Sequence, residues 1–136
     1  LEYTSWVRYQ MHPTSTQSVA VDAVLTHGSG TAITRGAKLI RLERWMNGFD
    51  ADIYGHGHVH DVILHAGSPY LRLDRGGKLK QKRKVGAMTG CYFRTYTQDV
   101  APSYGEKRNF PPVVIGSPVF TISFDPQGNY SVSVSA

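Results

Sequence analysis

Two short hydrophobic segments of the sequence each end in a turn made of glycine and histidine. Residues 19–25 lead into Thr26-His27-Gly28-Ser29-Gly30, and residues 51–54 lead into Gly55-His56-Gly57-His58-Val59-His60. Between them, residues 34–49 carry apolar side chains at helical spacing after a threonine suited to cap a helix. This order predicts a strand, a helix and a strand, as in a βαβ unit. Both groups of histidines would then follow strands.

The second half of the chain has the alternating pattern and turn residues of short strands. Together with the first half, this predicts an α/β fold in one domain spanning residues 1–136, of which 40% are hydrophobic and 18% charged. No apolar stretch reaches the roughly 18 residues of a membrane-spanning helix, so we expect no membrane. The expected strands are 6–11, 62–65, 69–73, 84–95, 119–124 and 130–134, with one helical turn at 104–108.

The net charge of +5 is concentrated in one segment. Residues 72–84 hold seven basic side chains and one acidic side chain, whereas the rest of the chain sums to −1. A basic cluster can bind nucleic acid through its phosphates, and Lys80, Lys82, Arg83 and Lys84 are the candidates. The alternative is a solvated hairpin loop, which Gly76-Gly77 favours. As a non-catalytic binding module, the chain would use this segment to contact nucleic acid or a partner protein.

Three histidines occupy alternate positions at 56, 58 and 60. In an extended segment, alternate side chains point to the same side, so this spacing brings imidazoles together. Neutral imidazole is a good ligand for Zn, Fe, Mn or Ni. His27, in a similar turn, is a further candidate. The alternative is a solvated loop that is rich in histidine.

These residues, taken together, resemble the carboxyl half of calcineurin-like metallophosphoesterases of the phage and bacterial type. The resemblance rests on His27 after one strand, and on Ala51-Asp52-Ile53-Tyr54 followed by Gly57-His58-Val59-His60. It implies that His27 and His58 bind one metal ion and His60 a second. In the competing alignment, Gly55-His56-Gly57-His58 is the motif. His56 and His58 are accordingly the candidate catalytic residues.

The resemblance continues more weakly over residues 86–118 and so covers nearly the whole chain. It implies the second half of a metallophosphoesterase β-sandwich flanked by helices, which hydrolyses phosphoester bonds of a phosphomonoester, a phosphodiester or nucleic acid. Arg94, Tyr104 and Lys107 are the substrate-side candidates. Residues 86–118 could equally be a sheet edge and a packing turn.

The sequence departs from this family in lacking the motifs of its amino half, namely Asp-x-His, Gly-Asp-x-x-Asp and Gly-Asn-His. Those motifs supply the carboxylate that bridges the two metals. We therefore expect a dinuclear centre to be incomplete in this chain, and we expect the chain to pair with an amino-terminal half or with itself. The lone Cys91 is compatible with a reducing compartment, and the resemblance favours the cytoplasm of a bacterial or phage-infected cell.

Overall fold

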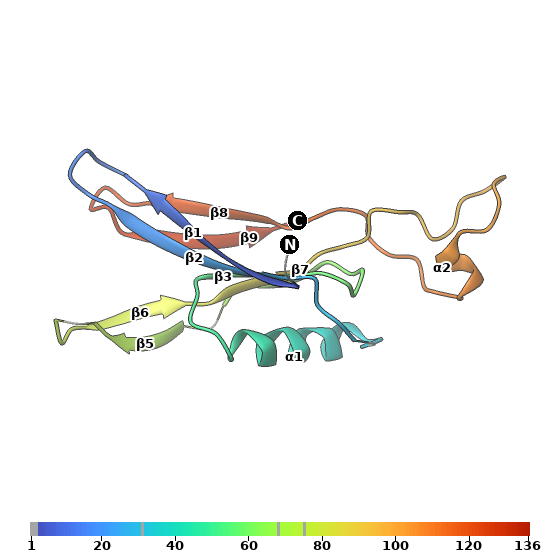
Figure 1. The fold of residues 1–136 in the computed structure, drawn as a ribbon, viewed down its shortest axis with the longest axis horizontal. Helices are drawn as coiled ribbons and strands as arrows, with labels where there is room; N and C mark the ends of the chain where they lie inside the picture. Colours follow the sequence, from blue (N-terminus) through green and yellow to red (C-terminus); the bar gives the residue numbers. More distant parts are fainter. Residues whose placement is uncertain (1–2, 31, 68, 75) are drawn as a thin grey trace.

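The computed structural model describes residues 3–30, 32–67, 69–74 and 76–136. Strands predominate in this part of the chain, and two helices accompany them (Figure 1). The elements are β1 (Thr4–Met11), β2 (Val19–Thr26), α1 (Arg35–Met46), β3 (Ile53–His56), β4 (Ile63–His65), β5 (Pro69–Leu73), β6 (Leu79–Arg83), β7 (Val85–Met88), α2 (Tyr104–Lys107), β8 (Val119–Phe124) and β9 (Tyr130–Ser135).

The central sheet has five strands in the order β1-β2-β3-β7-β4. Strands β2, β3 and β7 are parallel, and β1 and β4 pair antiparallel at the two edges. The predicted βαβ unit is therefore present as β2-α1-β3. In the register of this sheet, Thr26 lies beside His56 and His56 beside Met88. The carboxyl ends of β2 and β3 consequently lie side by side, which brings the two histidine turns together.

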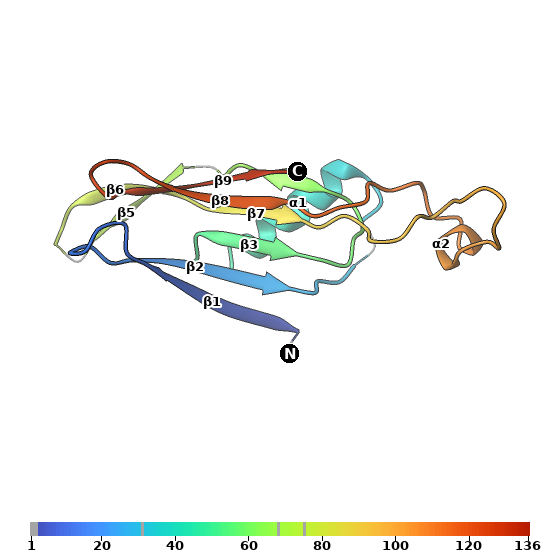
Figure 2. The same ribbon diagram turned by 90° about the horizontal axis from the view of Figure 1, so that it is seen from above.

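Each face of the central sheet is covered by a different layer. Figures 1 and 2 show α1 on one face and the β8–β9 hairpin on the other. On the α1 face, Leu42 and Met46 pack against Val24 and Tyr54. On the opposite face, alternate residues of the hairpin, such as Phe120, pack against a second small core. The chain thus has a mixed α/β fold with sandwich-like layers, as expected in outline.

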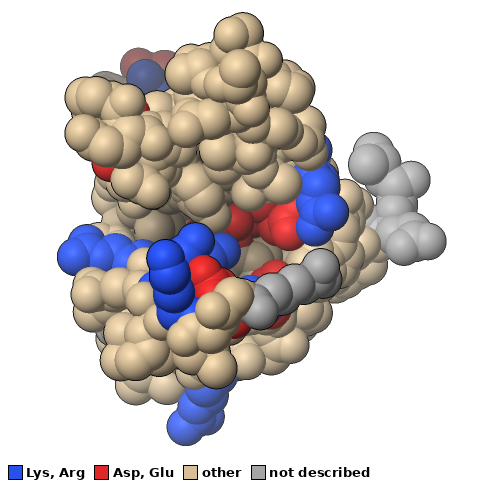
Figure 3. Space-filling model, turned by 90° about the vertical axis from the view of Figure 1, so that its left-hand side faces the viewer, with Lys and Arg blue, Asp and Glu red and all other residues tan. Residues whose placement is uncertain are grey.

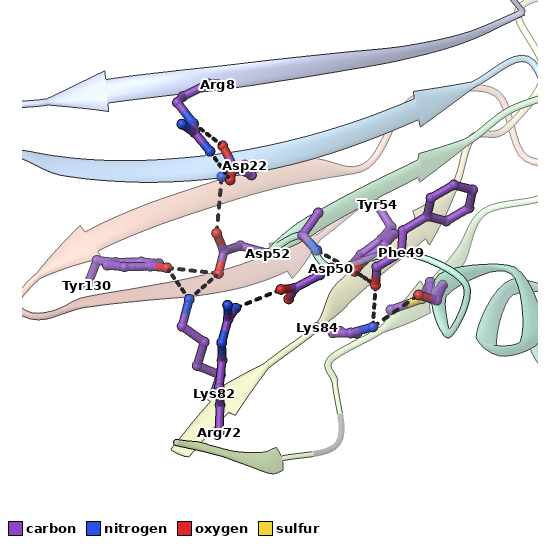
Figure 4. A network of polar contacts seen from close by, with 12 residues as sticks. Arg8, Asp22, Phe49, Asp50, Asp52, Tyr54, Arg72, Lys82, Lys84 and Tyr130 are labelled. Atoms are coloured by element: carbon purple, nitrogen blue, oxygen red, sulfur yellow. Dashed lines mark hydrogen bonds and ion pairs between the residues drawn. The ribbon is translucent and has the colours of Figure 1, made fainter. Parts of the chain in front are cut away.

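Helix α1 begins as predicted and ends earlier than predicted. The Thr34 side chain accepts a hydrogen bond from the Ala37 amide, which makes it the N-cap. At the other end, the Lys84 ammonium donates to the carbonyls of Met46 and Phe49, so a distant lysine satisfies the last turn (Figure 4). The expected apolar stripe is confirmed, with Leu42 and Met46 buried.

Two other expectations for the sheet differ from the structure. The strand expected over 84–95 is limited to Val85–Met88, and the chain beyond it pairs with a different segment, since the Cys91 amide donates to the Val114 carbonyl at 3.1 Å. Residues 79–83 form β6 of a regular hairpin with β5 rather than a loop. Neither helix in the described part of the chain is long and apolar enough to cross a membrane.

Candidate functional site

The histidine turns meet at the carboxyl edge of the parallel strands. The Gly57 amide donates to the Thr26 carbonyl at 3.0 Å, which extends the β2–β3 ladder into both turns. A Cβ at Gly57 would lie 2.9 Å from the His27 carbonyl oxygen. Glycine is thus required here for the second turn to approach the first.

His27 and His58 are brought into direct contact. The Nδ1 atom of His58 lies 3.2 Å from Nε2 of His27, and the two rings meet edge to face with centroids 5.1 Å apart. Two imidazole nitrogens on one tetrahedral cation, each at a typical Zn–N bond length, would be about 3.3 Å apart. In this structure the two nitrogens are hydrogen-bonded to each other, and their separation is close to that of two imidazole ligands on one metal ion.

The backbone of the second turn takes an unusual conformation at both motif histidines. His58 has φ 72° and His60 has φ 51°, which is the left-handed region. This conformation costs a residue with a side chain on the order of 1 kcal/mol or more, and it is concentrated at functional sites. In this backbone conformation, the His58 ring lies against His27.

His60 lies beside the pair and contacts a different neighbour. Its ring packs edge to face on Phe93, with centroids 5.5 Å apart. Burial lowers the pKa of His60, and positive charge on His58 or His27 lowers it further. A lowered pKa keeps the imidazole neutral, which is the form that binds metal. The His60 ring thus contacts Phe93, whereas the rings of His27 and His58 contact each other.

His56 is buried beneath the turns, with only 3% of its surface exposed. Its ring packs on Trp45 with centroids 5.4 Å apart, and its Nδ1 atom lies 2.8 Å from the Gly57 carbonyl oxygen. Burial lowers the pKa of His56, which favours the neutral ring. These contacts give His56 a supporting position beneath the turns.

An acidic residue next to His60 is fully engaged by α1. The Asp61 carboxylate accepts from Lys38 Nζ at 3.1 Å and from the Arg35 guanidinium at 2.9 Å. Lys38 and Asp61 are each only 9% exposed. These ion pairs of Asp61 with Lys38 and Arg35 were not predicted from the sequence. A signal was available, because Lys38 falls on the buried side of α1, four residues before Leu42, and a buried lysine requires an acidic partner.

A third cation from α1, Arg41, lies over the first histidine turn. The Arg41 guanidinium donates to the Ser29 hydroxyl at 3.2 Å, and it occupies the space in which a Cβ of Gly30 would lie. On the other side, the Tyr3 ring contacts His27, with centroids 5.6 Å apart, and the Tyr3 hydroxyl donates to the Gly28 carbonyl. The pattern of the sequence did not single out Arg41, which is suited to attract an anion.

Two aspartates of the central sheet, Asp22 and Asp52, lie in a separate polar network (Figure 4). Asp52 accepts from the Tyr130 hydroxyl at 2.8 Å and from the Asp22 amide at 3.1 Å. The Asp22 carboxylate in turn pairs with Arg8 at 2.7 Å. Across residues 3–30, 32–67, 69–74 and 76–136, no group of three or more histidine, cysteine, aspartate or glutamate side chains is placed to hold a metal ion.

Several cations of the segment 72–84 are also committed to contacts within the chain. Lys82 lies 3.6 Å from Asp52, Arg72 pairs with Asp50 at 2.7 Å, and Lys80 lies 3.5 Å from Asp74. Arg72, Lys82, Asp50 and Asp52 line a cleft of about 600 Å³. Figure 3 shows a hollow in which basic and acidic side chains gather. Of the four nucleic-acid candidates, Arg83 is exposed and forms no ion pair within the described residues.

The substrate-side candidates lie on or near α2, which Figure 1 shows far from α1. Arg94, Tyr104 and Lys107 are exposed. The Tyr104 ring packs on Phe110 and lies beneath the Arg108 guanidinium. In the described part of the chain, none of the three candidates forms a hydrogen bond or ion pair with the histidines. Comparison with protein-family models, with curated protein sequences and with solved structures finds no match to this chain.

Proposed function

We propose that this chain provides one side of a metal-dependent site that hydrolyses phosphoester bonds. His27 and His58 would hold one divalent cation, and His60 would reach a second. The observation that supports this most directly is the 3.2 Å separation between His58 Nδ1 and His27 Nε2. Imidazole ligands suit Zn, Fe or Ni, and they bind Mn more weakly.

The site needs negatively charged ligands from elsewhere. Two divalent cations a few ångströms apart repel each other strongly, and the three histidines bring no charge to offset this repulsion. The nearest carboxylate in sequence, Asp61, is occupied by Lys38 and Arg35. We therefore propose that a further segment or a partner chain supplies the carboxylates.

The residues around the pair have distinct roles in this proposal. A divalent cation, once bound, supplies polarisation of a phosphoryl oxygen and activation of water. Arg41, at the rim, attracts the anionic substrate through its guanidinium charge. His56 and Gly28 keep the two turns in contact, because the His56 ring fills the space beside Gly28.

Calorimetric titration with zinc or manganese tests the ligand assignment. We expect His27→Ala and His58→Ala each to abolish measurable binding, since one imidazole alone holds a cation weakly. His12→Ala is the matched control, because His12 is exposed in the turn between β1 and β2. Affinity that survives the double change His58→Ala with His60→Ala would show that the site is elsewhere. Loss of affinity in His56→Ala alone would favour the other alignment.

A second experiment tests the reaction itself. With manganese and a generic aryl phosphodiester, we expect little hydrolysis by this chain alone and a large gain when a chain that carries Asp-x-His and Gly-Asn-His motifs is added. Full hydrolysis by the chain alone would mean that its own carboxylates complete the site. No gain with the partner would count against the proposal.

A further inference from the structure

Strand β1 presents an open edge of the central sheet. It is the terminal strand in the order β1-β2-β3-β7-β4, and Figure 2 shows it beyond β2 with no strand on its outer side. The His27 amide donates to the Tyr3 carbonyl at 3.0 Å, so residue 3 faces β2 in the ladder. Because backbone groups alternate along a strand, the even-numbered residues 4, 6, 8 and 10 direct their N–H and C=O groups to the open edge.

This edge lacks the features that usually keep a strand from pairing with another chain. Those features include proline, lysine and an unpaired charge. Residues 4–11 contain neither proline nor lysine. Their one charged side chain, Arg8, is neutralised by two contacts with Asp22, at 2.7 and 2.8 Å. Two large aromatic side chains are exposed on the strand, Trp6 by 57% and Tyr9 by 44%.

We propose that two copies of this chain pair antiparallel through β1, about a two-fold axis at Val7. In this register, Trp6 lies opposite Arg8 of the second copy, and this pair occurs twice. An indole face and a guanidinium attract each other by a cation–π interaction. Tyr9 lies opposite Ser5, and Val7 lies opposite its own copy. The central sheets of the two copies become one continuous sheet.

The competing registers are less favourable. Side chains paired across an antiparallel ladder must lie on the same face of the sheet, and successive side chains of a strand lie on opposite faces. The two-fold axis must therefore pass through a residue and not between two residues. An axis at Arg8 places Trp6 opposite Gln10 and so loses both contacts between Trp6 and Arg8. An axis at Trp6 shortens the overlap to residues 4–8. The axis at Val7 combines long overlap with complementary pairs.

Sedimentation of the wild-type chain and two variants tests the dimer. Trp6→Lys places an ammonium opposite Arg8 of the second copy at both symmetric positions, so we expect the dissociation constant to rise by at least about tenfold. Val100→Lys is the control, since Val100 is 60% exposed outside β1, and its dissociation constant should not change. A wild-type chain that is monomeric at high micromolar concentration overturns the proposal, as does a dimer that Trp6→Lys leaves unchanged.

Oxidative cross-linking tests the register without disturbing the interface, in a Cys91→Ser background. Residues that lie directly opposite each other in a non-hydrogen-bonded antiparallel pair have Cα atoms close enough for a disulfide. We expect Val7→Cys to form a covalent dimer with itself, and a mixture of Ser5→Cys and Tyr9→Cys chains to cross-link, while each of these two alone does not. Cross-linking of Val7→Cys with Tyr9→Cys in place of these products would move the axis to Arg8 and overturn the register. If β1 binds a different protein and not a second copy of this chain, none of these variants will cross-link. That result also overturns the proposal.

Discussion

Two glycines with the same backbone conformation show how closely the histidine turns are packed. Gly28 and Gly77 both have φ 77°. A Cβ at Gly28 would lie 2.2 Å from the His56 ring, whereas a Cβ at Gly77 would meet nothing within 4 Å. The two positions therefore share the cost of the left-handed conformation and differ only in the contact with His56.

Substitutions at Gly28 and Gly77 therefore separate the energetic cost of backbone strain from the cost of displacing a packed side chain. We expect Gly77→Ala to lower the free energy of unfolding by about 1 kcal/mol and Gly28→Ala by about 2–4 kcal/mol, because only the second displaces a buried ring. Urea denaturation measures both. Equal costs would mean that the His56 ring moves aside freely. Gly28→Ala should also weaken zinc binding, since it shifts the turn that carries His27.

The ion pair between Arg8 and Asp22 makes stability depend on pH. Its hydrogen bonds hold the pKa of Asp22 below the ordinary value of 3.8. A carboxyl whose pKa is lower in the folded state stabilises the fold above the unfolded pKa, and this contribution is lost as the pH falls through the folded pKa.

Asp22→Asn should therefore lower the thermal midpoint near neutral pH, and the difference from the wild type should shrink as the pH falls below about 3.8. Thermal unfolding followed by circular dichroism over this range measures the effect. Asp99→Asn, at an exposed turn position with positive φ, is the control and should follow the wild-type curve. A difference that stays constant with pH would contradict the assignment to this carboxylate.

At the scale of elements, α1 is joined to the second histidine turn by a buried ion pair. Lys38 and Asp61 lie 3.1 Å apart, and both are nearly inaccessible to solvent. Breaking such a pair from one side leaves a buried charge unpaired, and replacing both partners by apolar residues avoids that penalty. The pair thus couples the helix to the position of His60.

Lys38→Met should lower the free energy of unfolding by about 3 kcal/mol, and the double change Lys38→Met with Asp61→Leu should recover part of the loss. Chemical denaturation of the two variants measures this. Lys107→Met, at an exposed position, should change stability by less than about 0.5 kcal/mol. If the double variant is less stable than Lys38→Met, the ion pair between Arg35 and Asp61 contributes more to stability than the pair between Lys38 and Asp61.

At the scale of the whole molecule, much of the basic segment is used within the fold. Lys84 caps α1, and Lys82 contacts Asp52 and Tyr130. Lys78 and Arg83 are exposed and form no ion pair with the residues that the structure describes. Only such exposed cations are free to replace the counterions of a phosphate backbone.

Nucleic-acid binding by this segment, if measured, should therefore depend on Lys78 and Arg83. We expect the double variant Lys78→Gln with Arg83→Gln to reduce the slope of log affinity against log salt concentration by about 0.9 for each phosphate that is no longer neutralised. Lys82→Gln with Lys84→Gln should mainly lower the unfolding midpoint instead. The opposite result, with salt dependence removed only in the second variant, would place the phosphate-binding cations in the cleft.

The sequence by itself determined the features that depend on neighbouring residues. The βαβ order, the Thr34 cap, the apolar stripe of α1 and the placement of histidines after strands all follow from periodicity and turn chemistry over a few residues. Strands 69–73 and 119–124 were predicted with the bounds that the structure has. Trp6 is 57% exposed although its ring packs on Phe49, because β1 is an edge strand of the sheet.

Only the tertiary structure decided how the candidate site is assembled. His27 and His58 are 31 residues apart in the chain, and the parallel pairing of β2 and β3 brings their nitrogens into contact. The burial of His56 and the capture of Asp61 by α1 are likewise products of packing between distant segments. A side chain becomes a ligand, a support or half of an ion pair according to which other segments lie around it, and local sequence patterns do not encode those neighbours.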